Sequence, residues 1–167
     1  MAVREVLLLG NPRLFQVSTQ IGEDELEEVS RVVVDLHDTL MDFRNQHSVG
    51  RAIAAPQIGY PKRLIYVCID EPLVLINPSL EDLSRETMLV WDDCMCFPEL
   101  LVRVRRHRSC RLQYRDRHWQ QCRMALQDDL AELLQHECDH LRGVLAVSMA
   151  VDGHSFALKS QKHLLDL

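Results

Sequence analysis

The chain has 167 residues, a length that suits one domain with its own core, and we expect a single domain over residues 1–167. Its composition, 47% hydrophobic and 26% charged, is typical of a globular protein and excludes a disordered or fibrous chain. The formal net charge of -6 provides no extended basic field, so nucleic-acid recognition is not expected despite a local arginine cluster over residues 103–111.

The N-terminal segment MAVREVLLLGNPRL shows no sign of a secretory signal. Its apolar run is closed by Gly10 and Pro12 and is too short for the hydrophobic region of such a signal. No other stretch approaches the roughly 20 apolar residues that a membrane span requires. The six cysteines are therefore expected to be reduced thiols or metal ligands rather than a disulfide framework. We expect a cytoplasmic protein without membrane association.

Helical and strand patterns follow one another along the chain. From Glu23 to about Asn45, apolar residues recur at steps of three and four, which predicts an amphipathic helix. Short segments rich in β-branched and aromatic residues predict strands at residues 64–69, 73–76, 87–91, 101–105 and 110–114. The helical pattern returns between Gln127 and Leu141, with Gly143 placed to end it. This order predicts an α+β fold with antiparallel β-sheets packed around a central helix.

The motif QHECDH at residues 135–140 places two histidines on the second predicted helix. His136 and His140 are four residues apart, so their imidazoles project from one helix face and can share a metal ion. Glu137 completes an HExxH pattern, in which the carboxylate sits beside a metal-bound water and moves its proton. The competing interpretation is a chance pair of histidines on an amphipathic helix, and the predicted helical placement of the motif disfavours it.

A catalytic metal site needs three protein ligands and an open position, so a third ligand has to come from another segment. Cys94, in WDDCMCFP, is the best candidate, because a thiolate binds soft and borderline divalent ions strongly. Cys96 is the competitor, since residues two apart in an extended segment face the same way and both sulfurs could close a structural Cys2His2 site. Alternatively, Cys96 is a small buried hydrophobic residue, as free cysteines often are.

Three segments occur in the order and with the separations of the signature motifs of peptide deformylases, which the chain resembles over most of its length. They are GRAIAAPQIG at residues 50–59, DDCMC at 92–96 and QHECDH at 135–140. VLLLGNPRL at 6–14, PLVLINP at 72–78 and HLRGVL at 140–145 are also similar to family segments. The resemblance implies an α+β fold around the histidine-bearing helix. It also implies hydrolytic removal of the N-formyl group from the initiator methionine of new polypeptides.

The resemblance further implies a role for each site residue. One divalent ion, usually Fe2+ and replaceable by Ni2+, Co2+ or Zn2+, would be held by three ligands: Cys94, His136 and His140. Glu137 would take a proton from the metal-bound water and deliver it to the leaving amine. The side-chain amide of Gln57 and the backbone N–H of Met95 would stabilise the oxyanion. The partner would be an N-formylated peptide, with transient ribosome association and no contact with nucleic acid or membrane.

The middle motif departs from the EGCLS pattern of the family. Asp93 replaces a glycine, which often marks a strained backbone or a close approach to a ligand, so we expect slower turnover or shifted substrate choice. Asp92 keeps a carboxylate that is suited to pairing with Arg106. In the first motif Ala52 replaces the second glycine. On the helix, Glu132 is placed either at the edge of the methionine pocket or on the solvated surface.

Two other functions remain open on the sequence. A closed or obstructed site would make the chain a catalytically silent, metal-stabilised binding module, and an altered groove would direct hydrolysis to another formylated substrate. A general HExxH metalloprotease is disfavoured, because Cys94 as third ligand and the AAPQ segment have no place in it. The last segment, HSFALKSQKHLLDL, is expected to form a short amphipathic helix or a frayed tail.

Overall fold

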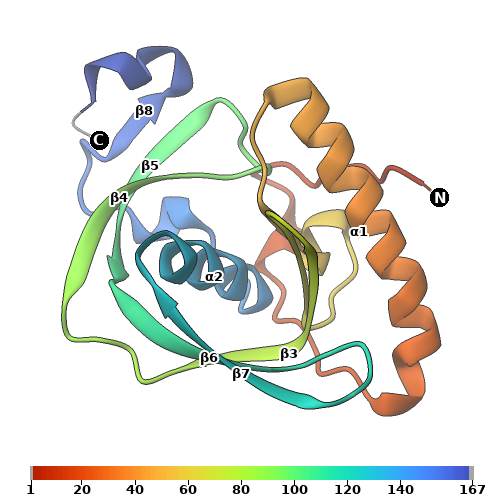
Figure 1. Ribbon diagram of the computed structural model, residues 1–167. Coiled ribbons are helices and arrows are strands. Elements are labelled where there is room, and N and C mark those ends of the chain that lie inside the picture. The colour runs from red at the N-terminus through yellow and green to blue at the C-terminus, as the bar shows by residue number, and fades with distance from the viewer. Residues whose placement is uncertain (1, 166–167) are drawn as a thin grey trace.

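A computed structural model describes residues 2–165 and shows an α+β fold with one helix at its centre (Figure 1). The helices are α1 (Leu26–His47) and α2 (Asp128–Leu141). The strands are β1 (Ala52–Ala54), β2 (Leu64–Cys68), β3 (Pro72–Glu81), β4 (Thr87–Asp93), β5 (Leu100–His107), β6 (Ser109–Arg115), β7 (Gln121–Gln127) and β8 (Phe156–Leu158).

The strands form two antiparallel sheets. The first has the order β1-β2-β3-β6-β7 and the second has the order β4-β5-β8. Helix α2 lies between the two sheets, and α1 covers the outer side of the first sheet (Figure 1). The arrangement confirms the predicted fold class of antiparallel sheets packed around the helix that carries the HExxH motif.

Strand β2 is a continuous run of apolar residues because both of its faces are buried. Ile65 and Val67 pack in the hydrophobic cluster that contains the buried residues of α2. Leu64 and Tyr66 point to the other face and pack with α1. Because successive side chains of a strand alternate between faces, a strand buried on both sides needs apolar residues at every position. This packing places α2 against one face of the first sheet.

The end of α2 is fixed by a glycine, as the sequence predicts. Gly143 has a φ of +70°, a backbone conformation that glycine adopts without a steric penalty. A Cβ atom at this position would lie 2.4 Å from the carbonyl oxygen of Phe15. The N-terminal segment therefore packs directly against the chain leaving the histidine-bearing helix.

The predicted helix over residues 23–45 corresponds to α1 and the 3-10 turn Glu23–Glu25 before it, and the predicted strands correspond to β2 to β6. Strands β1 and β7 were not predicted: β1 is only three residues long, and the two-residue alternation of Cys122, Met124 and Leu126 in β7 is a strand signal that was missed. The expectation of a short helix or a frayed tail for the C-terminal segment missed a strand. Residues 156–158 form β8 against β5, and the 3-10 turn Lys159–Leu164 follows, with residues 166–167 outside the described part.

Neither helix within residues 2–165 combines the length and the apolar character needed to cross a membrane.

Candidate metal centre

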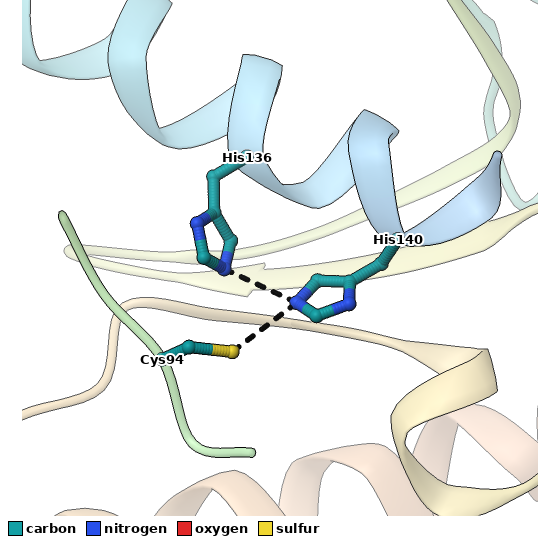
Figure 2. Close-up of side chains that lie close together, drawn as sticks. All are labelled: Cys94, His136 and His140. Carbon is teal, nitrogen blue, oxygen red and sulfur yellow. Dashed lines mark hydrogen bonds between the residues drawn. The ribbon is translucent and has the colours of Figure 1, made fainter. Parts of the chain in front are cut away.

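Cys94, His136 and His140 come together beneath α2 (Figure 2). One ligand atom of each residue lies within 4.8 Å of the others, and all three side chains are buried. Nε2 of His140 lies 3.3 Å from Sγ of Cys94 and 3.1 Å from Nε2 of His136. The structure therefore brings the three predicted ligands into one group.

The three donors converge because of the spacing of the histidines on α2 and a turn at Cys94. The two histidines are one helical turn apart on α2, so both rings leave the same face of the helix. Cys94 follows the end of β4, where the amide of Phe97 donates to the carbonyl of Cys94 at 3.1 Å and closes a turn. The amide of Leu9 donates to the carbonyl of Cys96 at 2.8 Å, so the N-terminal segment braces the same turn.

The donor atoms fit a divalent ion. Donors that share a tetrahedral ion at bond lengths of about 2.0 Å for nitrogen and 2.3 Å for sulfur lie roughly 3.3–3.6 Å apart. The separations of His140 Nε2 from the other two donors, 3.3 and 3.1 Å, are close to that spacing. Burial, and then the hydrogen bond with Cys96, raises the pKa of the Cys94 thiol well above its usual range. A coordinated ion would remove this obstacle, because it stabilises the thiolate directly.

Cys96 lies outside this group of donors. Within residues 2–165, the cluster of metal-ligating side chains consists of Cys94 and the two histidines. The Cys96 side chain is buried, 1% exposed, and its sulfur lies 3.5 Å from Nε2 of Gln57. This placement agrees with the interpretation of Cys96 as a buried residue rather than a fourth ligand, and it leaves the group with three protein donors.

Asp92 connects the metal group to a buried arginine. Its Oδ1 lies 2.8 Å from Nδ1 of His136, and its Oδ2 accepts a hydrogen bond from Arg106 at 2.7 Å. Arg106 is only 2% exposed and also pairs with Asp139. The predicted pairing of Asp92 with Arg106 is confirmed. With Nδ1 engaged by a carboxylate, the His136 ring presents Nε2 to the metal group.

These charges shift the pKa values of both partners. Burial raises the pKa of Asp92, but His136 and Arg106 outweigh it and hold the value at about 2. Burial lowers the pKa of His136, but the Asp92 charge outweighs it and raises the value to about 10. Burial and the neighbouring His136 charge lower the pKa of His140 well below its usual range. Because a ligating imidazole must be neutral, a proton and a metal ion compete for His136.

We predict that Asp92→Asn weakens metal binding by about 10–100-fold, the typical cost of losing an outer partner of a ligating histidine. The neutral asparagine amide lacks the negative charge with which Asp92 attracts and orients the His136 ring. Titration against a competing chelator measures the effect. Asp82→Asn is the matched control, since Asp82 forms an exposed ion pair with Arg111 at 2.9 Å. Unchanged affinity in a folded Asp92→Asn protein would contradict the assigned role.

Glu137 lies on α2 directly after the first histidine and is 4% exposed. Its Oε2 has no hydrogen-bond partner among the described residues. Burial is the main reason that the pKa of Glu137 is raised to about 7. Desolvation of this kind favours the neutral form of a carboxyl group. A carboxyl group with a pKa near neutrality can both accept and donate a proton.

Gln57 and Met95 flank the donor group on separate turns. The amide of Ala54 donates to Oε1 of Gln57 at 2.7 Å, which fixes the side-chain amide. Its Nε2 then points to the sulfurs, at 3.7 Å from Cys94 and 3.5 Å from Cys96. Met95 follows Cys94 in the turn, is buried, and lines the pocket. Both residues lie where the sequence placed them, beside the three donors.

A pocket of about 760 Å³ opens beside the metal group. His136 and Glu137 line it together with Gln57 and Leu133. A cavity of this volume suits a ligand larger than a single small ion.

Two substituted positions of the signature motifs lie at this pocket. Ala52 pairs with Val67 of β2 as an ordinary strand residue, and its methyl group packs in the cluster around α2. Asp93, at the end of β4, pairs with Leu101 of β5 and does not have a positive φ. Replacing the glycine of the family motif therefore causes no backbone strain here. Its carboxylate instead forms an ion pair with Lys159 at 2.9 Å.

Sequence reasoning missed two charged residues of the pocket wall. Arg51 lies before β1 and pairs with Glu132 of α2 at 3.1 Å. Its position in the otherwise apolar segment GRAIAAP was the available signal. Lys159 reaches the pocket from the C-terminal segment, for which the sequence had offered no function. Glu132, in contrast, lines the pocket as one of its two expected placements required.

Three comparisons relate the chain to known proteins. The sequence profile described as polypeptide deformylase matches residues 3–155. The peptide deformylase of Leptospira biflexa serovar Patoc is 30% identical over 184 residues, covering 99% of this chain and 100% of the relative. A class I type b peptide deformylase from Acinetobacter baumannii, solved with Met-Ala-Ser, has a TM-score of 0.81 and 26% identity, covering 89% of this chain and 98% of that chain. The Ehrlichia chaffeensis enzyme in complex with actinonin has a TM-score of 0.82 and 26% identity over 91% of each chain.

The fold, the Cys/His/His group and the adjacent carboxyl group define a metal-dependent hydrolase. The profile match extends over most of the chain and includes all three donor residues. The chain belongs to the polypeptide deformylase family, whose members remove the N-formyl group from the N-terminal methionine of new polypeptides.

Proposed function

We propose that the chain performs the deformylation reaction of its family as one catalytic domain, with Glu137 as the proton carrier. The observation that carries the proposal is the buried Glu137 carboxyl group, which lies beside the Cys/His/His group and lines an open pocket. A structural metal site needs neither a carboxyl group with a pKa near neutrality nor space for a ligand. The combination therefore favours hydrolysis.

The proposed ligands are Cys94, His136 and His140, and the proposed ion is Fe2+, with Ni2+, Co2+ or Zn2+ as substitutes. One thiolate and two imidazoles suit borderline divalent ions of this kind. When bound, such an ion supplies Lewis acidity and lowers the pKa of water toward neutrality. The chain prepares the donors in advance, because Asp92 orients the His136 ring and the turn after β4 positions Cys94.

Glu137 would hold the proton during the reaction. With a pKa of about 7, its carboxylate can accept a proton from water as the oxygen attacks the formyl carbon. The same carboxyl group can then deliver the proton to the amine nitrogen as the C–N bond breaks. Formate and a peptide with a free N-terminus leave the site.

Gln57 and Met95 would stabilise the negative charge that develops on the formyl oxygen. Because Oε1 of Gln57 is occupied by the amide of Ala54, its Nε2 remains oriented toward the metal group. The backbone N–H of Met95 lies in the turn directly after Cys94. Fixed donors need no reorganisation during the reaction, and removal of one such donor typically costs about 100–1,000-fold in rate.

The proposed partner is an N-formylated peptide that binds in the pocket. The A. baumannii enzyme binds Met-Ala-Ser, which supports a peptide ligand for a chain of similar fold. We further propose a cytoplasmic location with transient association with the ribosome, where formylated chains emerge. All six cysteines are free thiols, which fits a reducing compartment.

A catalytically silent binding module is the second candidate. It would require a closed or obstructed metal site, with Cys96 as a fourth ligand. Within residues 2–165 the donor group does not include Cys96, and a pocket lies beside Glu137; both observations favour catalysis over this candidate.

Formate release from formyl-Met-Ala-Ser by protein purified anaerobically with Fe2+ or Ni2+ tests the proposal. We expect release that depends on the metal and stops when a chelator removes it. Bound metal without any formate release would count against deformylation and in favour of the silent module.

We predict that Asp93→Gly raises kcat/KM for formyl-Met-Ala-Ser by up to about fivefold, the equivalent of the roughly 1 kcal/mol that an exposed charge interaction contributes. The substitution removes a carboxylate from the pocket edge and restores the residue typical of the family motif. Steady-state kinetics measures the change.

Lys159→Met is the matched control for this prediction. It breaks the same ion pair but keeps the Asp93 carboxylate, so we expect no gain in kcat/KM. If Asp93→Gly leaves the efficiency unchanged or lowers it, the carboxylate does not restrict the substrate.

A further inference from the structure

An ion pair forms part of the pocket wall next to the metal group. Arg51, before β1, donates to Oε2 of Glu132 at 3.1 Å. Glu132 lies on α2, one helical turn before the ligand His136, so both side chains face the same side of the helix. The Glu132 side chain is 14% exposed and that of Arg51 is 43% exposed. The carboxylate is therefore deep in the pocket and the guanidinium is nearer its mouth.

Among the charged groups around Glu132, Arg51 is its direct partner. Asp92, His136 and Arg106 also act on the carboxylate, but Asp92 is already paired with both Arg106 and the His136 ring. With a side chain only 14% exposed, the Glu132 carboxylate meets little water, and this burial is the main factor that raises its pKa. A side chain that enters this part of the pocket lies against an ion pair whose carboxylate is largely shielded from water and whose guanidinium is partly exposed.

The chemistry of the entering side chain then decides affinity. A methionine side chain would cover the ion pair and remove its remaining water without offering a hydrogen bond, which is unfavourable for buried charges. A glutamine side chain has nearly the same length, and its amide offers both a donor and an acceptor. The N–H group can donate to the Glu132 carboxylate, and the carbonyl can accept from the Arg51 guanidinium. Both are charge-assisted bonds, which are stronger than neutral ones.

We propose that Arg51 and Glu132 are specificity-determining residues that make the pocket favour a first residue with a side-chain amide over methionine. The proposal rests on the proposed function in one respect, namely that the N-terminal residue of a peptide binds in this pocket. It adds a substrate class to that function: formylated peptides or related formyl amides with a polar first side chain.

Binding of Met-Ala-Ser and Gln-Ala-Ser to the metal-loaded protein tests the proposal without requiring turnover. We expect the native protein to bind Gln-Ala-Ser about tenfold more tightly, the usual effect of a buried hydrogen bond to a charged group. In the double variant Arg51→Leu with Glu132→Leu, the pocket wall becomes apolar and the preference should reverse in favour of Met-Ala-Ser. Titration calorimetry gives both dissociation constants.

Two further variants control the measurement. Glu132→Leu alone leaves Arg51 partly in solvent, so it provides a milder change if the double variant folds poorly. The reversal should already be visible there as a smaller shift toward Met-Ala-Ser. Arg31→Leu with Glu27→Leu removes an exposed ion pair on α1, 2.7 Å long and away from the pocket, and should leave the preference unchanged.

The outcomes separate this proposal from the proposed function. Tighter or equal binding of Met-Ala-Ser by the native protein, an unchanged ratio in both leucine variants, or no binding of either peptide overturns the specificity proposal. Formate release from formyl-Met-Ala-Ser and formyl-Gln-Ala-Ser is measured on the same samples. Preferential binding of Gln-Ala-Ser without release from either formylated peptide supports the specificity proposal and contradicts deformylation.

Discussion

Glu137→Ala is expected to lower formate release from formyl-Met-Ala-Ser by about 1,000-fold or more while the protein keeps its metal. General acid–base catalysis typically contributes about 100–10,000-fold, and here one carboxyl group would serve both proton transfers. Metal content should not change, because Glu137 does not belong to the donor group of Cys94, His136 and His140. Single-turnover kinetics and elemental analysis on the same sample provide the two measurements.

Glu137→Gln distinguishes a role in proton transfer from a role of the side-chain shape. It preserves the volume of the buried side chain but cannot carry the proton, so its activity should fall nearly as far as that of the alanine variant. Glu27→Ala on the exposed face of α1 controls for the loss of a carboxylate elsewhere on the protein. An active Glu137→Gln enzyme would show that Glu137 positions groups rather than moving the proton.

Cys94→Ala is expected to abolish stoichiometric metal binding, whereas Cys96→Ala should retain it. The two cysteines are both buried and lie two residues apart, so they form a matched pair of thiol deletions in one turn. Only Cys94 supplies a sulfur to the donor group within residues 2–165. Its loss should exceed the roughly 10–100-fold effect of losing an outer partner. Chelator competition and metal content after dialysis measure the difference.

The opposite result would change the function assigned to the chain. Equal loss of metal in both variants would mean that Cys96 also coordinates the ion, which corresponds to a closed Cys2His2 site and a silent binding module. Retention of metal in Cys94→Ala would mean that the two histidines bind the ion with some other donor. Far-UV circular dichroism of each variant without metal distinguishes loss of a ligand from loss of the fold.

The altered second motif keeps the contacts that the proposed site uses. Asp92 retains a carboxylate between His136 and Arg106, and Met95 retains its backbone amide after the ligand cysteine. At two further substituted positions, Asp93 pairs with Lys159, and Cys96 contacts the Gln57 amide. Of the two, only Asp93 lines the pocket, while Cys96 is buried, and the donor group of Cys94, His136 and His140 is intact.

The sequence by itself determined the features that depend on local periodicity. The apolar stripe of α1 and the alternation of strands such as β5 follow from the 3.6- and two-residue repeats of helix and strand. The spacing of His136 and His140 placed both rings on one face of α2, and Gly143 marked its end. Motif order added Cys94, Gln57 and Glu137 as site residues, and the structure places them together.

Only the tertiary structure decided the features that depend on contacts between distant segments. Whether Cys96 joins the donor group depends on how the turn after β4 meets Gln57, and no repeat encodes that arrangement. The C-terminal segment pairs with β5 because an open strand edge is available there, which its own sequence does not reveal. The Arg51–Glu132 pair joins residues 81 positions apart. Local patterns fix the secondary structure and the identity of the donors, whereas the packing of α2 between the sheets sets what the pocket accepts.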